Sequence, residues 1–348
     1  MIALDNIRLI FTFIVAFLLA FATTPIVKIF AERIGAMDIP KDSRRVHNHP
    51  IPRLGGLAIF YSFLIAILCF CDITIPIRGI LLGAVIIVTV GVIDDLTNLP
   101  AWSKLLFQII AASVVILHGV TIEFFTNPFN TESYINLGFW SIPITLIWII
   151  GITNAVNLID GLDGLAVGVS SITAISLLVI SIIMNESGIA ILSIALAGSG
   201  FGFIPFNFYP AKIFMGDTGS MFLGYMLACI SLLGLFKVYA LLSFAVPFLI
   251  LALPIFDTVF AIFRRLAKGQ SPMTPDRGHM HHRLIDRGFT QKQAVTILYT
   301  LSSLLSLSAV VLMLNGGGRA IILIISVFAL IVAGGIYFKE TKEINRSE

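Results

Sequence analysis

The segment VNLIDGLDGLA begins at residue 156 and carries three polar side chains at a spacing of three, Asn157, Asp160 and Asp163. On a helical turn this spacing places the three side chains on roughly one face, where they would form a small oxygen-rich patch. A glycine follows each aspartate directly, which suits a tight turn and lets a substrate approach the backbone. A capped, solvated loop explains the same pattern, so the segment alone leaves both interpretations open.

Two further acidic positions lie at the ends of apolar runs. Asp94 and Asp95 are adjacent in GVIDDLTNLPAWSK, after such a run, where an acidic pair opposes the helix macrodipole and needs compensation. Lys104 and a bound metal ion are both candidates for that compensation. Asp217 lies in FMGDTGS, directly before another run, where an ordinary helix N-cap is the competing interpretation.

These ligand types indicate a hard cation. Carboxylate and amide oxygens without a thiolate select Mg²⁺, which takes one or two protein carboxylates and fills its shell with phosphate oxygens. We therefore expect Mg²⁺, with Mn²⁺ as a substitute, and a substrate that carries a diphosphate. The basic side chains that could bind its charge, or serve only topology and anionic lipids, are Arg44, Arg45, Arg53, Lys104, Arg264, Arg265, Arg277 and Arg283.

Three histidines lie together in the segment HMHHR, as His279, His281 and His282. No cysteine lies nearby and oxygen ligands dominate elsewhere, which argues against a zinc site. Imidazole suits phosphate binding or proton transfer near neutral pH, and a solvated basic loop is the alternative.

The composition indicates what must position these residues. Of the 348 residues, 58% are hydrophobic and 12% are charged. A run of about 20 apolar residues spans a bilayer, and only helices satisfy the backbone inside lipid without the alternating polarity of barrel strands. We predict an all-α polytopic membrane protein with about eleven spans, near 9–30, 54–72, 76–93, 104–122, 139–155, 165–184, 188–205, 218–236, 240–262, 293–314 and 319–338.

The distribution of Lys and Arg predicts the orientation. With the N-terminus outside, eighteen of these residues fall on one side of the membrane and four on the other, so the richer side and the C-terminus are cytoplasmic. We expect one membrane-embedded domain over residues 1–348, with cytoplasmic loops at about 31–53, 94–104, 154–165, 206–217 and 263–292.

All the polar clusters fall on these cytoplasmic loops. A transporter would place its functional polar groups near the bilayer midplane, often on broken helices. Clustering at one face favours an enzyme at the surface of the cell membrane, and a nucleotide-sugar transporter remains the alternative. No nucleic-acid partner is expected.

Five ordered segments carry a family resemblance: DIPKDSRRVHNHPIPRLGGLA, GVIDDLTN, NAVNLIDGLDGLA, NFYPAKIFMGDTGS and HMHHR. In this order they resemble the polyprenyl-phosphate N-acetylhexosamine-1-phosphate transferases, or glycosyltransferase family 4. The muramoyl-pentapeptide branch has three consecutive histidines, and a lysine where this chain has Asn98. The chain is therefore more similar to the branch that uses UDP-N-acetylglucosamine.

The resemblance implies a role for each matching residue. Asp217 would bind Mg²⁺, with Asn157 or neighbouring carboxylates, and Phe214 would stack on uracil beside Asn207. Asp160 and Asp163 would line the nucleoside site. Asp94 and Asp95 would activate the acceptor, Lys104 would lie in the cleft, and the histidines with Arg283 would bind the donor's phosphate or sugar.

The implied reaction transfers N-acetylglucosamine 1-phosphate from its UDP derivative to undecaprenyl phosphate and releases UMP. Another UDP-N-acetylhexosamine, or the muramoyl-pentapeptide donor, is the alternative. We favour one direct displacement over a covalent aspartyl-phosphate intermediate. A homodimer is one option for the assembly.

Overall fold

The computed structural model describes residues 2–40, 49–126, 134–235, 242–271, 278–315, 318–319 and 321–326. Three of the predicted anion-binding residues, Arg44, Arg45 and Arg277, lie outside the described residues, as does most of the last predicted span.

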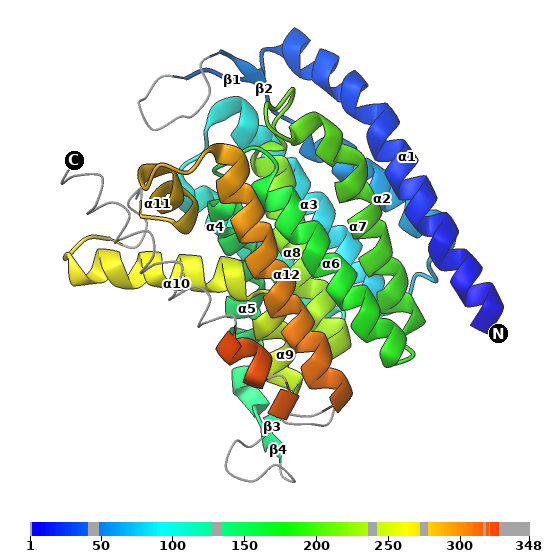
Figure 1. The fold of residues 1–348 in the computed structure, drawn as a ribbon. Coiled ribbons are helices and arrows are strands. Elements are labelled where there is room, and N and C mark those ends of the chain that lie inside the picture. Colours follow the sequence, from blue (N-terminus) through cyan, green and yellow to red (C-terminus); the bar gives the residue numbers. More distant parts are fainter. Residues whose placement is uncertain are drawn as a thin grey trace.

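Long helices dominate this part of the chain, as the sequence predicts, and most of them lie side by side in one bundle (Figure 1). Their bounds are α1 Ile2–Ile34, α2 Gly56–Phe70, α3 Ile75–Thr97, α4 Ala101–Leu117, α5 Ser141–Ile159, α6 Leu165–Ile183, α7 Ser187–Asn207, α8 Gly216–Leu235, α9 Leu242–Ile250, α10 Ala252–Ala267, α11 Met280–Asp286 and α12 Gln291–Asn315. Within the described ranges, seven helices are long and apolar enough to cross a membrane, and α2 and α4 are shorter apolar helices. The all-α membrane class is confirmed; the count of eleven spans and the orientation stay predictions.

Helix α8 is the central helix of the bundle. Every residue from 218 to 234 is buried, and α8 packs against α2, α3, α5 and α6. Small residues permit the closest approaches, since a Cβ at Gly56 would collide with the backbone at Gly219, and one at Gly91 would collide with Thr218. Close backbone contact through small residues is the usual way in which membrane helices associate. This packing fixes the N-terminus of α8 against α2 and the C-terminal end of α3.

The ninth predicted span, 240–262, is not one continuous helix. It divides at Leu251 into α9 and α10, and α10 lies across the long axis of the bundle (Figure 1). On α10 the apolar side chains of Phe256, Phe260 and Phe263 are exposed, whereas Asp257 and Arg265 are buried. Helix α10 is therefore amphipathic, and its buried face packs against α5 and α12.

Two short antiparallel strand pairs mark opposite ends of the described bundle. β1 Met37–Asp38 pairs with β2 Ile51–Pro52, and β3 Phe124–Thr126 pairs with β4 Tyr134–Asn136. The β1–β2 pair and α11 lie toward one end of the bundle, and the β3–β4 pair lies at the other (Figure 1). The polar segments singled out from the sequence gather at the end that carries β1–β2.

Candidate active site

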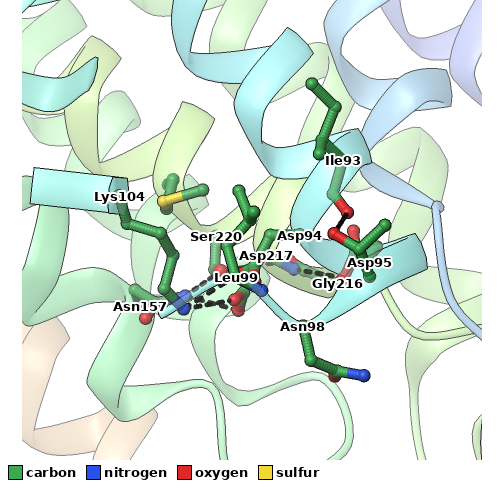
Figure 2. Close-up of polar contacts among 12 residues, drawn as sticks. Ile93, Asp94, Asp95, Asn98, Leu99, Lys104, Asn157, Gly216, Asp217 and Ser220 are labelled. Atoms are coloured by element: carbon green, nitrogen blue, oxygen red, sulfur yellow. Dashed lines mark hydrogen bonds and ion pairs between the residues drawn. The ribbon is translucent and has the colours of Figure 1, made fainter. Parts of the chain in front are cut away.

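Asp217 lies in the first turn of α8, and side chains from two other helices hold its carboxylate. Gly216 has a φ of 69°, a left-handed conformation that lets the preceding loop turn into α8. Asn157, in the last turn of α5, donates from Nδ2 to Asp217 Oδ1 at 2.8 Å, and Lys104 on α4 donates from Nζ to Oδ2 at 2.9 Å (Figure 2). The sequence separates these residues widely, and three neighbouring helices bring them together.

Lys104 also compensates the acidic end of α3. Its Nζ lies 2.8 Å from Asp94 Oδ2, and Asp94 Oδ1 accepts the backbone N–H of Leu99 at 2.6 Å. Asp94 is buried, with 4% of its surface exposed. One ammonium group therefore bridges the carboxylates of Asp94 and Asp217, and of the predicted acidic pair Lys104 contacts Asp94 alone.

Asp95 has a different environment from its neighbour. Its Oδ1 accepts the N–H of Asp217 at 2.9 Å, and its Oδ2 accepts the N–H and the hydroxyl of Thr218 at 3.1 and 2.6 Å. The first N–H groups of a helix have no partner within that helix, so Asp95 acts as a cap for α8 supplied by α3. Figure 2 shows Asp95 on the side of Gly216, away from Lys104.

The aspartates after α5 form a wall beside Asp217. Because α5 ends at Ile159 and α6 begins at Leu165, the three-residue spacing does not continue as one helical face. Asp163 Oδ2 accepts the N–H of Ala211 at 2.9 Å, and Asn207 uses both atoms of its amide, accepting from Gly164 N at 3.1 Å and donating to the carbonyl of Ile213 at 3.0 Å. Asp163 and Asn207 thus fasten two loops together, and both still border the same space.

That space is a cavity of about 340 Å³. Five carboxylates line it, and the main positive group is Arg53, with His282 and Phe214 on the same walls. Burial, and then the charges of Asp217, Asp95 and Asp163, raise the pKa of Asp160 well above its usual range. The lining carboxylates are Asp38, Asp95, Asp160, Asp163 and Asp217. Such an excess of negative charge is the setting that a bound cation stabilises.

Arg53 and Phe214 reach the cavity through a backbone junction. They form a parallel β-bridge, in which Phe214 N donates to the carbonyl of Pro52 at 2.8 Å and Gly55 N donates to the carbonyl of Phe214 at 2.9 Å. Arg53 Nη2 donates to Asn98 Oδ1 at 3.3 Å, whereas its Nε is buried without a hydrogen-bond partner. A buried N–H without a partner is costly, so this guanidinium is suited to an anionic ligand.

The three histidines occupy three different environments. His279 is buried, with Nδ1 2.8 Å from Asp257 Oδ2, and His281 is buried against Gly161. Burial and the neighbouring His282 lower the pKa of His281 to about 3, so its ring is neutral at physiological pH. Among the three, only His282 lines the described cavity.

Some residues at the site were not singled out from the sequence. Ser220 accepts from Asn157 Nδ2 at 2.8 Å, and Asp38 lines the cavity. Asp257 caps α11 through Met280 N at 2.7 Å. A lone carboxylate inside a predicted span was a usable signal for Asp257, because charge in a span usually marks a function. Arg283 is exposed and does not line the described cavity.

Comparison with known proteins gives consistent similarities. Residues 77–235 match the family described as glycosyl transferase family 4. The probable undecaprenyl-phosphate N-acetylglucosaminyl 1-phosphate transferase of Bacillus subtilis is 44% identical over 88% of this chain and 85% of its own length. The decaprenyl-phosphate N-acetylglucosaminephosphotransferase of Mycolicibacterium smegmatis is 35% identical over 91% and 85%. The phospho-N-acetylmuramoyl-pentapeptide-transferase of Halalkalibacterium halodurans is 30% identical over 87% and 97%.

Proposed function

Because the chain belongs to glycosyl transferase family 4, we propose that it transfers N-acetylglucosamine 1-phosphate from UDP-N-acetylglucosamine to a polyprenyl phosphate and releases UMP. The family predicted from the five motifs is confirmed. Two relatives named for N-acetylglucosamine transfer are 44% and 35% identical, above the 30% of the muramoyl-pentapeptide relative, which supports this donor. Undecaprenyl phosphate, named for the Bacillus subtilis relative, is the proposed acceptor.

One structural observation carries the proposal most directly. Lys104 joins Asp94 to Asp217, and Asp217 lines a cavity whose walls are acidic and include Arg53. Phosphoryl transfer between two anions needs positioned charge more than covalent chemistry, and cations beside carboxylates supply it.

The residues fit a divalent cation whose shell the substrate completes. Among the described residues, no group of three His, Cys, Asp or Glu side chains is arranged to hold a metal ion. A carboxylate oxygen of Asp217, and the Oδ1 of Asn157 once its Nδ2 no longer donates to that carboxylate, would give two oxygen ligands, which is what Mg²⁺ takes when phosphate oxygens fill its other positions. We propose that these two residues hold it, with Mn²⁺ as a substitute; the bound ion would neutralise charge on the donor's diphosphate.

The reaction we propose is one direct displacement. An oxygen of the lipid phosphate attacks the β-phosphorus of the UDP-sugar, a new P–O bond forms, and the bond from that phosphorus to UMP breaks. A phosphate monoester has its second pKa near about 6, so the acceptor is already mostly a dianion. The protein therefore mainly aligns the two substrates and screens the repulsion between their phosphates. Lys104 attracts the acceptor phosphate, Arg53 binds the diphosphate, and Phe214 stacks on uracil.

The geometry supports Asp94, rather than Asp95, as the carboxylate that faces the acceptor. Asp94 shares Lys104 with Asp217, whereas both oxygens of Asp95 accept hydrogen bonds from the first turn of α8. We propose that Asp94 orients the acceptor and accepts any residual proton, and that Asp95 holds α8 and Asp217 in place.

The test is UMP release from purified protein with polyprenyl phosphate, Mg²⁺ and a panel of UDP-sugars. We expect UDP-N-acetylglucosamine to be preferred, with equal amounts of UMP and lipid-linked sugar. Preference for another UDP-N-acetylhexosamine, or for the muramoyl-pentapeptide donor, would overturn the donor assignment. Uptake of the intact donor into proteoliposomes without UMP release would favour a transporter. Exchange of labelled UMP into the donor without acceptor would favour the covalent intermediate.

We also propose that the site faces the cytoplasm across the cell membrane, because eighteen Lys and Arg residues fall on its predicted side and four on the other. In a Cys69→Ser background, a cysteine replacing Arg283 should react with an impermeant maleimide only after the cells are opened. One replacing Glu123 should react in intact cells. The reverse labelling pattern would show that the site faces the outside of the cell. The homodimer stays a prediction.

A further inference from the structure

A second polar contact lies one helical turn deeper in the bundle than Asp217. Asn154 on α5 donates from Nδ2 to Gln108 Oε1 at 2.7 Å, and Gln108 on α4 donates from Nε2 to Asn154 Oδ1 at 3.3 Å. Gln108 is buried, with 3% of its surface exposed, and its Nε2 also lies 3.6 Å from the sulfur of Met221 on α8. None of these three residues lines the cavity.

The two contacts repeat on the same three helices. Lys104, Asn157 and Asp217 form the outer tier; Asn157 and Asp217 line the cavity, and Lys104 contacts Asp217. Gln108, Asn154 and Met221 form the inner tier. Gln108 and Met221 each follow an outer-tier residue by four positions on the same helix, and Asn154 precedes one by three. Residues at this spacing lie one above the other on one helix face. The inner tier therefore connects α4 to α5 and contacts α8, one helical turn below the two side chains that donate hydrogen bonds to Asp217.

We propose that Gln108 and Asn154 are positioning residues, which set the separation of α4 and α5 so that Lys104 and Asn157 hold Asp217 from opposite sides. This inference rests on the proposed function for what the outer tier does. The amide pair is reciprocal, so it defines both the distance and the rotation of the two helices. A single apolar contact between the same helices would fix neither.

The competing explanation is that the amide pair only stabilises the bundle. The sizes of the losses in activity and in thermal midpoint distinguish this role from a positioning role. Interhelical hydrogen bonds in membrane bundles stabilise weakly, so losing this pair should lower the thermal midpoint by only a few degrees, even with the remaining amide unpaired. Partners that orient a metal ligand matter more, and losing them typically weakens metal affinity or activity by about 10- to 100-fold. The positioning role therefore predicts a large functional loss with little loss of stability.

The variants are Gln108→Met and Asn154→Leu, which keep the approximate side-chain size and remove one amide each. The exchange variant Gln108→Asn with Asn154→Gln restores both amides and their combined length. Ser113→Ala is the matched control, because Ser113 donates to the carbonyl of Ile109 within α4 and does not contact the site.

Three quantities should be measured on full-length protein in detergent: UMP release against Mg²⁺ concentration, Mn²⁺ bound in the presence of UMP by electron paramagnetic resonance, and the thermal midpoint. We expect each single variant to need about 10- to 100-fold more Mg²⁺ or to lose that much activity. Mn²⁺ binding should weaken in parallel. The exchange variant should recover most of both losses, and Ser113→Ala should match wild type.

Wild-type Mg²⁺ dependence and Mn²⁺ binding in both single variants would overturn the inference. So would losses that follow the thermal midpoint alone, or an exchange variant no better than the singles. If the wild-type protein binds Mn²⁺ normally and releases no UMP from any donor, the proposed function fails instead. The Mn²⁺ readout would then still decide the positioning role.

Discussion

The substitution Asp95→Asn should destabilise the whole site. The substitution Asp94→Asn should preserve the fold and stop the reaction. The two aspartates are adjacent on α3, yet successive residues of a helix point about 100° apart. Asp94 points toward Lys104, and Asp95 points toward the N-terminus of α8. The same substitution therefore removes two different kinds of interaction.

The size of each effect follows from the partners that are lost. Asp95 accepts three hydrogen bonds from Asp217 and Thr218 within 3.1 Å, and an asparagine offers only one oxygen to them. At least one buried N–H then faces an amide NH₂. An unsatisfied buried group costs about 1–3 kcal/mol, and the lost charge-assisted bonds add to this cost, so we expect about 2–4 kcal/mol in all. At Asp94 the asparagine oxygen can still accept from Leu99 N. Its NH₂ then faces Lys104 Nζ, which keeps Asp217 as a partner, so we expect a smaller stability cost of about 1–2 kcal/mol.

The assay combines the thermal midpoint in detergent with UMP release under saturating donor and acceptor. Asp95→Asn should lower the midpoint by several degrees and lower activity with it, and Thr218→Val should reproduce part of the loss of stability. Asp94→Asn should lower the midpoint less than Asp95→Asn does, yet lose activity by about 100-fold or more, as expected for a group that orients a reactant. Equal midpoints for the two variants, or full activity in Asp94→Asn, would refute this division of roles.

Further substitutions test the cavity walls. Arg53→Ala should raise KM for the UDP-sugar about 10- to 100-fold with a smaller effect on kcat, because a charged hydrogen bond to an anion is worth about 1.5–3 kcal/mol; an unchanged KM would remove Arg53 from the donor site. Asp160→Asn should abolish activity yet stabilise the metal-free protein. Because the pKa of Asp160 is raised in the folded state, the contribution of this carboxyl group to wild-type stability is fully present below its unfolded pKa of about 4 and is lost as pH rises. The gain in thermal midpoint should therefore be larger at about pH 8 than at about pH 5, and a constant gain would contradict the raised pKa. Gly161→Ala should push the His281 ring away and lower kcat about 10- to 100-fold, whereas wild-type kcat would show that α11 is not held by this contact.

The fold class could be predicted because bilayer thickness constrains a sequence strongly. Long apolar runs appear as α3, α5, α6, α7 and α8 with small shifts at their ends. The break between α9 and α10 could not be read from hydropathy, because 240–262 is apolar throughout most of its length. Only the fold reveals that Asp257 and Arg265 face a protein surface while the phenylalanines of α10 do not.

Site residues could be predicted where their partners lie close in the sequence. They could not be predicted where their contacts depend on the packing of distant segments. Charge compensation at the end of α3 pointed to Lys104, and the acidic residues after α5 do border one cavity. Adjacency in the sequence could not show that Asp95 caps α8, since that contact spans 122 residues. The pairing of Arg53 with Phe214 is also invisible in the sequence, because it requires β2 to reach the loop before α8.

The charges around Lys104 bear on the order of binding. One ammonium lies between the carboxylates of Asp94 and Asp217, so these three side chains together carry a net negative charge before any ligand arrives. The acidic residues that line the neighbouring cavity add to this negative charge, and the guanidinium of Arg53 opposes it. A diphosphate entering alone would meet repulsion in a poorly screened space. The donor should therefore bind measurably only with a divalent cation, and the acceptor phosphate, which approaches Lys104, should bind more tightly once the cation and donor are in place.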